Sequence, residues 1–192
     1  MIMTTLALTL SNRFYPRAAS WIRDIGLILT GSLLLAVLAQ VRIPLPFTPI
    51  PLTGQTFGVL LIGSALGAKR GLVSVILYIL VGALGMPFFA GGASGWQVLV
   101  GATSGYLVGF VFAAYIIGLL AERGLDRAFR TSFVPFLIGT LIIYFFGVAW
   151  LAILLGSFTK AILAGLLPFL LGDVIKLILA AMALPAVWKL VG

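Results

Sequence analysis

Long apolar runs, separated by short polar, glycine-rich or proline-rich segments, extend over most of the chain. A transmembrane helix needs about 20 predominantly apolar residues, and about 17 can be enough. This pattern predicts an all-α membrane protein with six transmembrane helices. The runs cover approximately residues 25–41, 52–68, 71–86, 103–121, 133–155 and 168–190.

Basic residues between these runs predict the orientation, because cytoplasmic connections of membrane proteins contain an excess of Lys and Arg. With the N-terminus in the cytoplasm, only Arg42 and Lys160 fall in outer connections. We therefore expect both termini in the cytoplasm, a multi-pass protein of the cell (inner or plasma) membrane, and contacts with anionic lipids. The expected inner basic residues are Arg13, Arg17, Arg23, Lys69, Arg70, Arg123, Arg127, Arg130 and Lys189.

Residues 1–23 are predicted to be a retained, partly amphipathic cytoplasmic lead-in. Arg13, Arg17 and Arg23 follow the first apolar run, whereas a cleaved signal peptide has its positive charge before that run. We find neither an internal repeat nor a domain boundary. The sequence therefore predicts one integral membrane domain over residues 1–192.

The composition excludes several kinds of chemistry. Of the 192 residues, 62% are hydrophobic and 8% charged, and the chain contains neither Cys nor His. Disulfides, Cys/His zinc sites and His-based catalysis are thus excluded, and we expect no cofactor and no metal. The net charge of +8 comes from residues between apolar runs, which does not indicate nucleic-acid binding. No phosphate-binding G-x-x-x-x-G-K-[ST] motif occurs, so active transport would need an energised partner or a gradient.

Three unusual connections are all expected at the outer end. The first has four prolines between Pro44 and Pro51 and should be extended. The second, at 85–105, is uncharged, aromatic and glycine-rich, and the third, at 156–167, is apolar but too short to span. Non-helical backbone at membrane depth must be buried in protein or line a cavity. We therefore expect a ligand pocket near the outer face.

Asp173 and Lys176 are charged residues inside the last apolar run. Their spacing of three places them on one face of a helix. Because a charge at membrane depth costs about 2.5 to 3.5 kcal/mol, both should face the interior. The two charges can simply neutralise each other, or they can bind a ligand that has N–H donors and an anionic group. A buried ion pair contributes little net stability, which favours the ligand.

Further candidates for the same pocket lie in the outer segments. Thr53 and Gln55 lie in the first turn of the predicted second helix, Gly92 and Trp96 lie in the glycine-rich segment, and Tyr106 lies in the first turn of the fourth helix. We expect these five residues to contact the ligand together with the charged pair. Each of the polar side chains can instead cap a helix or satisfy nearby backbone groups.

A catalytic alternative comes from the sequence Gly-Ala-Ser-Gly, which contains Ser94. A serine nucleophile needs a base, and the absence of His leaves only Lys160 or Lys176 for that role. We therefore expect no enzymatic activity and assign no catalytic residue.

Three segments resemble the signature segments of the BioY family, the biotin-binding S components of energy-coupling factor (ECF) transporters. They are IPLPFTPIPLTGQTFGVLL at 43–61, GALGMPFFAGG at 82–92 and LGDVIKLILA at 171–180. The resemblance implies biotin uptake, with Asp173 at the ureido ring and Lys176 near that ring or the carboxylate. The chain departs from the family pattern at Gly54, Ala102 and Ser104, which affects the expected pocket shape.

The resemblance also implies partners: a transmembrane coupling protein and two cytosolic ATPases. In such S components, small residues spaced by four on the first helix dock the coupling protein, and Ser32 and Ala36 have this spacing. Two alternatives to biotin uptake remain. The chain can be an S component for another vitamin, or a structural subunit of a membrane complex in which Asp173 and Lys176 merely pair.

Overall fold

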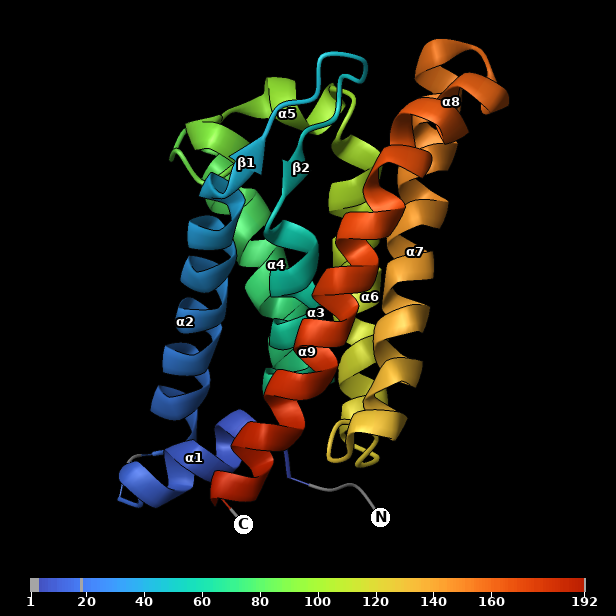
Figure 1. The fold of residues 1–192 in the computed structure, drawn as a ribbon. Helices are drawn as coiled ribbons and strands as arrows, with labels where there is room; N and C mark the ends of the chain where they lie inside the picture. Colours follow the sequence, from blue (N-terminus) through green and yellow to red (C-terminus); the bar gives the residue numbers. More distant parts are fainter. Residues whose placement is uncertain (1–3, 18, 192) are drawn as a thin grey trace.

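A computed structural model describes residues 4–17 and 19–191, which form a bundle of helices with one short β-hairpin (Figure 1). The chain order is α1 (Leu6–Phe14), α2 (Ser20–Gln40), β1 (Arg42–Ile43), β2 (Leu52–Thr53), α3 (Gln55–Leu66), α4 (Ala68–Ala83), the 3₁₀ turn η1 (Ala90–Gly92), α5 (Trp96–Val100), α6 (Ser104–Ala121), α7 (Phe129–Leu155), α8 (Phe158–Gly165), the 3₁₀ turn η2 (Leu167–Phe169) and α9 (Leu170–Val191).

The predicted all-helical membrane architecture is confirmed at the level of several spanning helices. Within the described residues, four stretches are long and apolar enough to cross a membrane: Ser20–Gln40, Ser104–Ala121, Phe129–Leu155 and Phe158–Val191. The last of these combines α8, η2 and α9.

Helix α3 has 12 residues and is shorter than the predicted helix at 52–68. Helix α4 has 16 residues, as many as the predicted helix at 71–86, but begins three residues earlier, at Ala68. At 1.5 Å per residue, α3 is about 18 Å long, less than the roughly 30 Å of a bilayer core. Thr53 still belongs to the hairpin, whose strands pair antiparallel with Arg42 opposite Thr53, so α3 begins only at Gln55.

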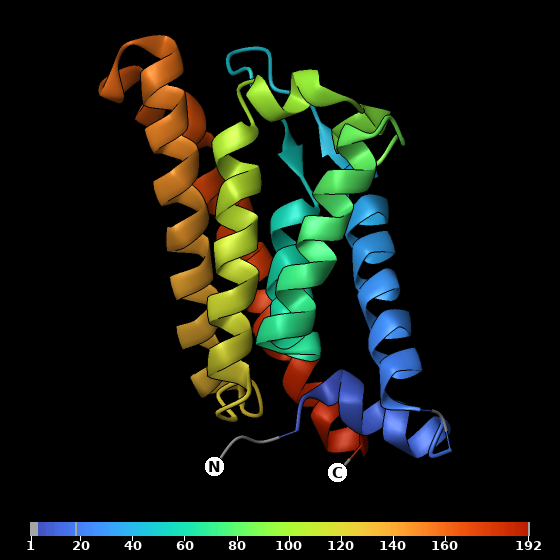
Figure 2. The same ribbon diagram turned by 180° about the vertical axis from the view of Figure 1, so that it is seen from behind.

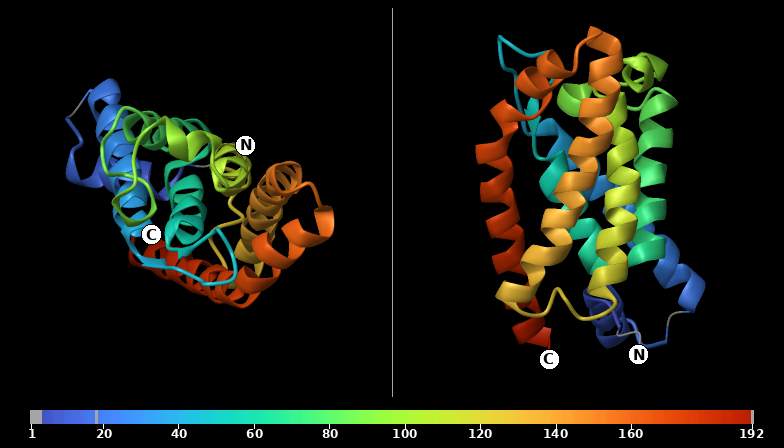
Figure 3. Two further views of the ribbon diagram at one scale, coloured as in Figure 1. Left: turned by 90° about the horizontal axis from the view of Figure 1, so that it is seen from above. Right: turned by 90° about the vertical axis from the view of Figure 1, so that its right-hand side faces the viewer.

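The two ends of the bundle are built differently, as Figures 1 and 2 show from opposite sides. The β1–β2 hairpin, η1, α5 and α8 lie at one end, so the three unusual connections gather at the same end of the bundle. Seen from that end, the chain between β1 and β2 runs beside α9 (Figure 3). The glycine-rich segment lies on the opposite side of α3 from this connection. Helix α1 and the last turns of α9 lie at the opposite end. The predicted lead-in thus includes α1 and the start of α2, and its residues 1–3 and 18 lie outside the described part.

Glycines let the central helices approach closely. A Cβ at Gly105 of α6 would lie 2.3 Å from the carbonyl oxygen of Phe146 in α7. A Cβ at Gly118 of α6 would lie 2.3 Å from the backbone nitrogen of Ala68, where α4 begins. Small residues commonly permit such contacts between membrane helices. Helix α6 therefore packs tightly on both α7 and α4.

The prediction that Ser32 and Ala36 dock a partner does not agree with the structure. Both side chains are buried, with 2% and 7% of their surface exposed, because this face of α2 packs on α4. The close approach is evident at Gly31, where a Cβ would lie 2.6 Å from Ser74 Oγ. Here the small residues serve packing within the bundle.

A buried acidic residue connects three elements at the end that contains α1. Asp126, in the connection between α6 and α7, has 1% of its surface exposed. Its Oδ2 accepts hydrogen bonds from Trp188 Nε1 of α9 at 2.9 Å and from Ser64 Oγ of α3 at 3.3 Å. The guanidinium of Arg127 lies over the Trp188 ring, 4.5 Å from its centroid. Burial raises the pKa of the Asp126 carboxyl, although the two hydrogen bonds and Arg127 oppose this effect.

Candidate ligand-binding site

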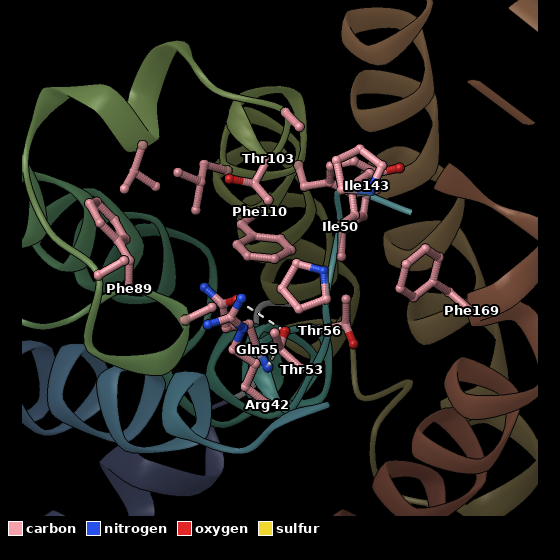
Figure 4. A pocket seen from close by; sticks show the side chains of 18 of the residues that line it. Arg42, Ile50, Thr53, Gln55, Thr56, Phe89, Thr103, Phe110, Ile143 and Phe169 are labelled. Carbon is pink, nitrogen blue, oxygen red and sulfur yellow. Dashed lines mark hydrogen bonds between the residues drawn. The ribbon is translucent and has the colours of Figure 1, made fainter. Parts of the chain in front are cut away.

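A cavity of about 250 Å³ lies at the hairpin end of the bundle. This volume is near the lower limit for small-molecule sites, roughly 300 Å³. Figure 4 shows Phe89, Phe110, Ile143 and Phe169 around the cavity, and Arg42, Thr53, Gln55 and Thr56 close together on one side of it. An apolar wall with a few convergent polar groups is the usual composition of a small-molecule site.

Asp173 and Lys176 both line this cavity and form an ion pair. Lys176 Nζ donates to Asp173 Oδ1 at 2.8 Å, as expected for residues on one face of α9. The same oxygen accepts from Thr56 Oγ1 of α3 at 3.1 Å, and Tyr144 of α7 donates its hydroxyl to Asp173 Oδ2 at 2.5 Å. Three helices thus position one carboxylate, whose side chain is 8% exposed.

The pair keeps some hydrogen-bonding capacity. A carboxylate offers about four lone-pair positions, and the three contacts from Lys176, Thr56 and Tyr144 occupy three of them. The ammonium has three hydrogens, of which two are directed to Asp173 Oδ1 and to Thr56 Oγ1 at 2.9 Å. Because both residues line the cavity, the pair can accept one hydrogen bond from a ligand and donate one to it.

Thr53 and Gln55 also line the cavity, as the sequence predicted. Gln55 Nε2 donates to the Tyr78 hydroxyl at 2.6 Å, and its Oε1 accepts from Thr53 Oγ1 at 3.0 Å. These contacts fix the amide of Gln55, which is a buried residue. A Cβ on Gly54 would lie 2.6 Å from the carbonyl oxygen of Leu38, so glycine lets the chain pass close to α2 here.

Tyr106 lines the cavity with its ring and connects two elements with its hydroxyl. The hydroxyl donates to the carbonyl oxygen of Gly165, at the end of α8, at 2.6 Å. A Cβ on Gly147 of α7 would lie 2.3 Å from the Tyr106 ring. The position of this aromatic wall therefore depends on α7 and α8 as well as on α6.

Gly92 and Trp96 do not line the cavity, contrary to the prediction. Trp96, the first residue of α5, is 68% exposed. Ala90 and Ala93, their neighbours in the glycine-rich segment, line the cavity instead. Ser94 is also outside the set of lining residues, so the serine proposed for a hydrolase does not share the cavity with Lys176.

The two other departures from the family pattern lie at the start of α6. Ala102 lines the cavity with a small side chain. The Ser104 hydroxyl donates to the carbonyl oxygen of Gly101 at 2.7 Å and is buried. Ser104 therefore satisfies local backbone, and Ala102 leaves room in the cavity.

Arg42, Thr56 and Tyr144 are among the lining residues that the predicted site did not include. Arg42 was assigned only to an outer connection, although it is one of the two basic residues there. Its side chain lies over the glycine-rich segment, where a Cβ on Gly91 would be 2.8 Å from Arg42 Nη1. Within residues 4–17 and 19–191, the ion pairs are Asp173–Lys176 and Asp24–Arg70, so no described carboxylate pairs with Arg42. This guanidinium adds a second positive charge to the cavity.

The comparisons with known proteins agree with this fold. The model of the BioY family matches residues 5–192. Biotin transporter BioY of Thermotoga maritima is 41% identical over 156 residues, which cover 81% of this chain and 91% of the relative. Biotin transporter BioY of Rhizobium etli is 38% identical over 148 residues, covering 73% and 79%. The crystal structure of the S-component for biotin from an ECF-type ABC transporter has a similar fold, with a TM-score of 0.80, 24% identity, and coverage of 88% of this chain and 92% of that chain. The chain described here belongs to the BioY family.

Proposed function

We propose that this protein binds biotin from outside the cell and delivers it to the cytoplasm as the S component of an ECF transporter. The observation that supports this most directly is the Asp173–Lys176 pair, which lines an apolar cavity and retains one acceptor position and one donor hydrogen. The family relatives named as biotin transporters support the identity of the ligand.

The chemistry of biotin matches the lining of the cavity. The molecule combines N–H donors and a carbonyl on a ureido ring with an apolar ring and chain and a terminal carboxylate. Asp173 accepts a hydrogen bond from a ureido N–H, and Lys176 donates to the ureido carbonyl. The aromatic walls, including Phe110 and Phe169, contact the apolar parts. Arg42, at the hairpin, faces the carboxylate.

For the membrane arrangement, we propose six crossings by α2, α3, α4, α6, α7 and α9, with the short α3 extended by the hairpin. The cavity end faces outward, and the end with α1 and the last turns of α9 faces the cytoplasm of a cell (inner or plasma) membrane. The distribution of basic residues supports this orientation, since Arg13, Lys69 and Lys189 belong to elements at or connected to the α1 end. The whole chain acts as one domain.

The energy for delivery comes from a transmembrane coupling protein and two cytosolic ATPases. The sequence offers no phosphate-binding loop of its own. Because Ser32 and Ala36 are buried, the contact on α2 involves other residues. The exposed side of α2 carries three apolar residues spaced by four. They are Leu29, Leu33 and Val37, which are 48%, 55% and 65% exposed.

The test is a titration of the purified protein in lipid nanodiscs with biotin and, separately, with other water-soluble vitamins. We expect one biotin to bind per chain and to be displaced only by biotin analogues. Binding of a different vitamin would identify an S component of another specificity. If the folded protein binds none of them, the structural-subunit alternative is the better account. The mass of any small molecule that copurifies provides an independent check.

A further inference from the structure

Helix α1 and the first turns of α2 lie next to each other at the opposite end of the bundle from the ligand cavity (Figure 2). A second concave surface lies between them. We call it the α1–α2 groove, and its volume is about 580 Å³. It is lined by Ala7, Leu10, Ser11, Phe14, Tyr15, Ile22, Arg23, Gly26, Leu27 and Thr30. Its lining is therefore apolar, with one charged side chain.

The surroundings of the groove are those of a membrane interface. Phe14, Tyr15 and Trp21 are 70%, 68% and 64% exposed at this end of the molecule. Exposed aromatic side chains concentrate at the boundary between lipid headgroups and hydrocarbon. Helix α1, which lies across the end of the bundle in Figures 1 and 2, has the orientation of an interfacial helix.

Only part of the Arg23 guanidinium has a hydrogen-bond acceptor. Its Nε is buried and has no hydrogen-bond acceptor in the described structure, while Nη1 donates to Asn12 Oδ1. The adjacent carboxylate of Asp24 is 2.7 Å from Arg70 Nε and is already paired. A guanidinium with a buried, unpaired N–H favours a bidentate anionic acceptor such as a phosphate.

We propose that the α1–α2 groove binds one anionic glycerophospholipid of the inner leaflet. The phosphate accepts from the Arg23 guanidinium, and an acyl chain lies along Leu10 and Leu27 and over Gly26. At Gly26, no atom lies within 4 Å of where a Cβ would be, so the backbone itself forms the floor of the groove. The proposal rests on the orientation proposed above and is independent of the ligand in the other cavity.

Charge complementarity distinguishes this occupant from a neutral lipid or an apolar protein segment. Arg13 and Arg17 belong to the same end as Arg23, and neither forms an ion pair with a carboxylate among residues 4–17 and 19–191. The cytoplasmic leaflet contains anionic lipids, and each Lys or Arg near its surface strengthens attraction to them. A groove that is apolar along its length and basic at one point matches an acyl chain with a phosphate at its end.

The test measures lipid retention by native mass spectrometry after delipidation in detergent, with phosphatidylglycerol or phosphatidylcholine added back. We expect the wild type to retain one phosphatidylglycerol in preference to phosphatidylcholine. Arg23→Gln should reduce that preference by about fivefold. Gly26→Trp should abolish retention of both lipids, since its side chain occupies the groove.

Matched controls are Leu33→Trp, on the exposed face of α2, and Arg130→Gln, an exposed arginine at the start of α7. Both should retain lipid like the wild type, and circular dichroism confirms that each variant is folded. If Arg23→Gln does not fold, Arg23→Lys replaces it, because the charge remains but the bidentate geometry is lost. Equal retention of the two lipids by the wild type overturns the proposal, as does unchanged retention in the Arg23 or Gly26 variant. A dimer mass that Gly26→Trp abolishes would assign the groove to a second copy instead. None of these readouts uses biotin, so failure here is distinguishable from failure of the transport proposal.

Discussion

The substitution Asp173→Asn tests whether the charged pair serves ligand binding or only stability. The variant keeps the size of the side chain but removes the negative charge that accepts from Lys176, Thr56 and Tyr144. It should therefore weaken both biotin binding and folding. The double variant Asp173→Asn/Lys176→Met separates the two effects, because it removes both charges and leaves no buried ammonium without a partner.

The expected magnitudes follow from the geometry of the site. A hydrogen bond to a charged group contributes about 1.5 to 3 kcal/mol, which corresponds to a roughly 10- to 150-fold increase in the Kd for biotin. Removal of one partner from a buried ion pair destabilises a protein by about 3 to 5 kcal/mol, whereas replacement of both partners is often neutral. The Lys176 side chain is 16% exposed, so it belongs to the buried case. We expect the double variant to regain stability but not affinity.

The assay combines isothermal titration with biotin and thermal unfolding of the same nanodisc samples. Asp24→Asn is the matched control, since Asp24 is also ion-paired, at 2.7 Å from Arg70, but its side chain is 42% exposed and does not line the cavity. It should leave biotin affinity unchanged and alter stability by no more than about 1 kcal/mol. If the double variant binds biotin as tightly as the wild type, the pair is structural and our assignment of the site is refuted.

Three further predictions concern single residues. Tyr144→Phe removes the hydroxyl that donates to Asp173 at 2.5 Å, and we expect thermal unfolding to show a loss of about 1.5 to 3 kcal/mol. Unchanged stability would contradict that contact. Arg42→Gln should weaken biotin binding about fivefold but leave binding of the uncharged biotin amide unchanged, because an exposed charge contributes up to about 1 kcal/mol. An equal loss for both ligands would exclude the carboxylate as the partner of Arg42. For Asp126, burial raises the pKa of the carboxyl in the folded state, so the folded protein holds this proton more tightly than the unfolded chain. Stability should then fall as pH rises from about 4 through the raised pKa, and Asp126→Asn should lack this slope in unfolding curves measured between pH 4 and pH 8. Parallel curves for the two proteins would show that Asp126 does not cause the slope.

The sequence could predict the charged pair because its geometry is local. A spacing of three residues on a helix places Asp173 and Lys176 together whatever the rest of the fold does. The long apolar runs likewise predicted α2, α6, α7 and α9, since length and hydropathy suffice for a membrane helix. The proline-rich connection was predictable because proline removes backbone donors and is incompatible with a helix interior.

Contacts between distant segments could not be predicted in the same way. Helix α7 is apolar on all sides, so no periodicity indicates which face turns inward, and Tyr144 could not be assigned to Asp173. The same ambiguity affected Ser32 and Ala36, because small residues permit close contact equally well inside a bundle and between proteins. The exposure of Trp96 depends on the short helix α5, which follows a glycine with φ of +88° and has no signal in the apolar pattern.

The hydrogen bonds around Asp173 explain how charges at membrane depth persist before a ligand arrives. Together with Lys176, Tyr144 and Thr56 fill three of the roughly four acceptor positions of the Asp173 carboxylate, so the protein itself offsets much of the desolvation cost. A ligand that binds at this pair, as we propose, does not need to break the ion pair, because one acceptor position and one ammonium hydrogen remain. Contacts added to a preorganised site do not spend binding energy on rearrangement. Under our proposal, the network that stabilises the pair is therefore also the feature that favours tight binding of a small ligand.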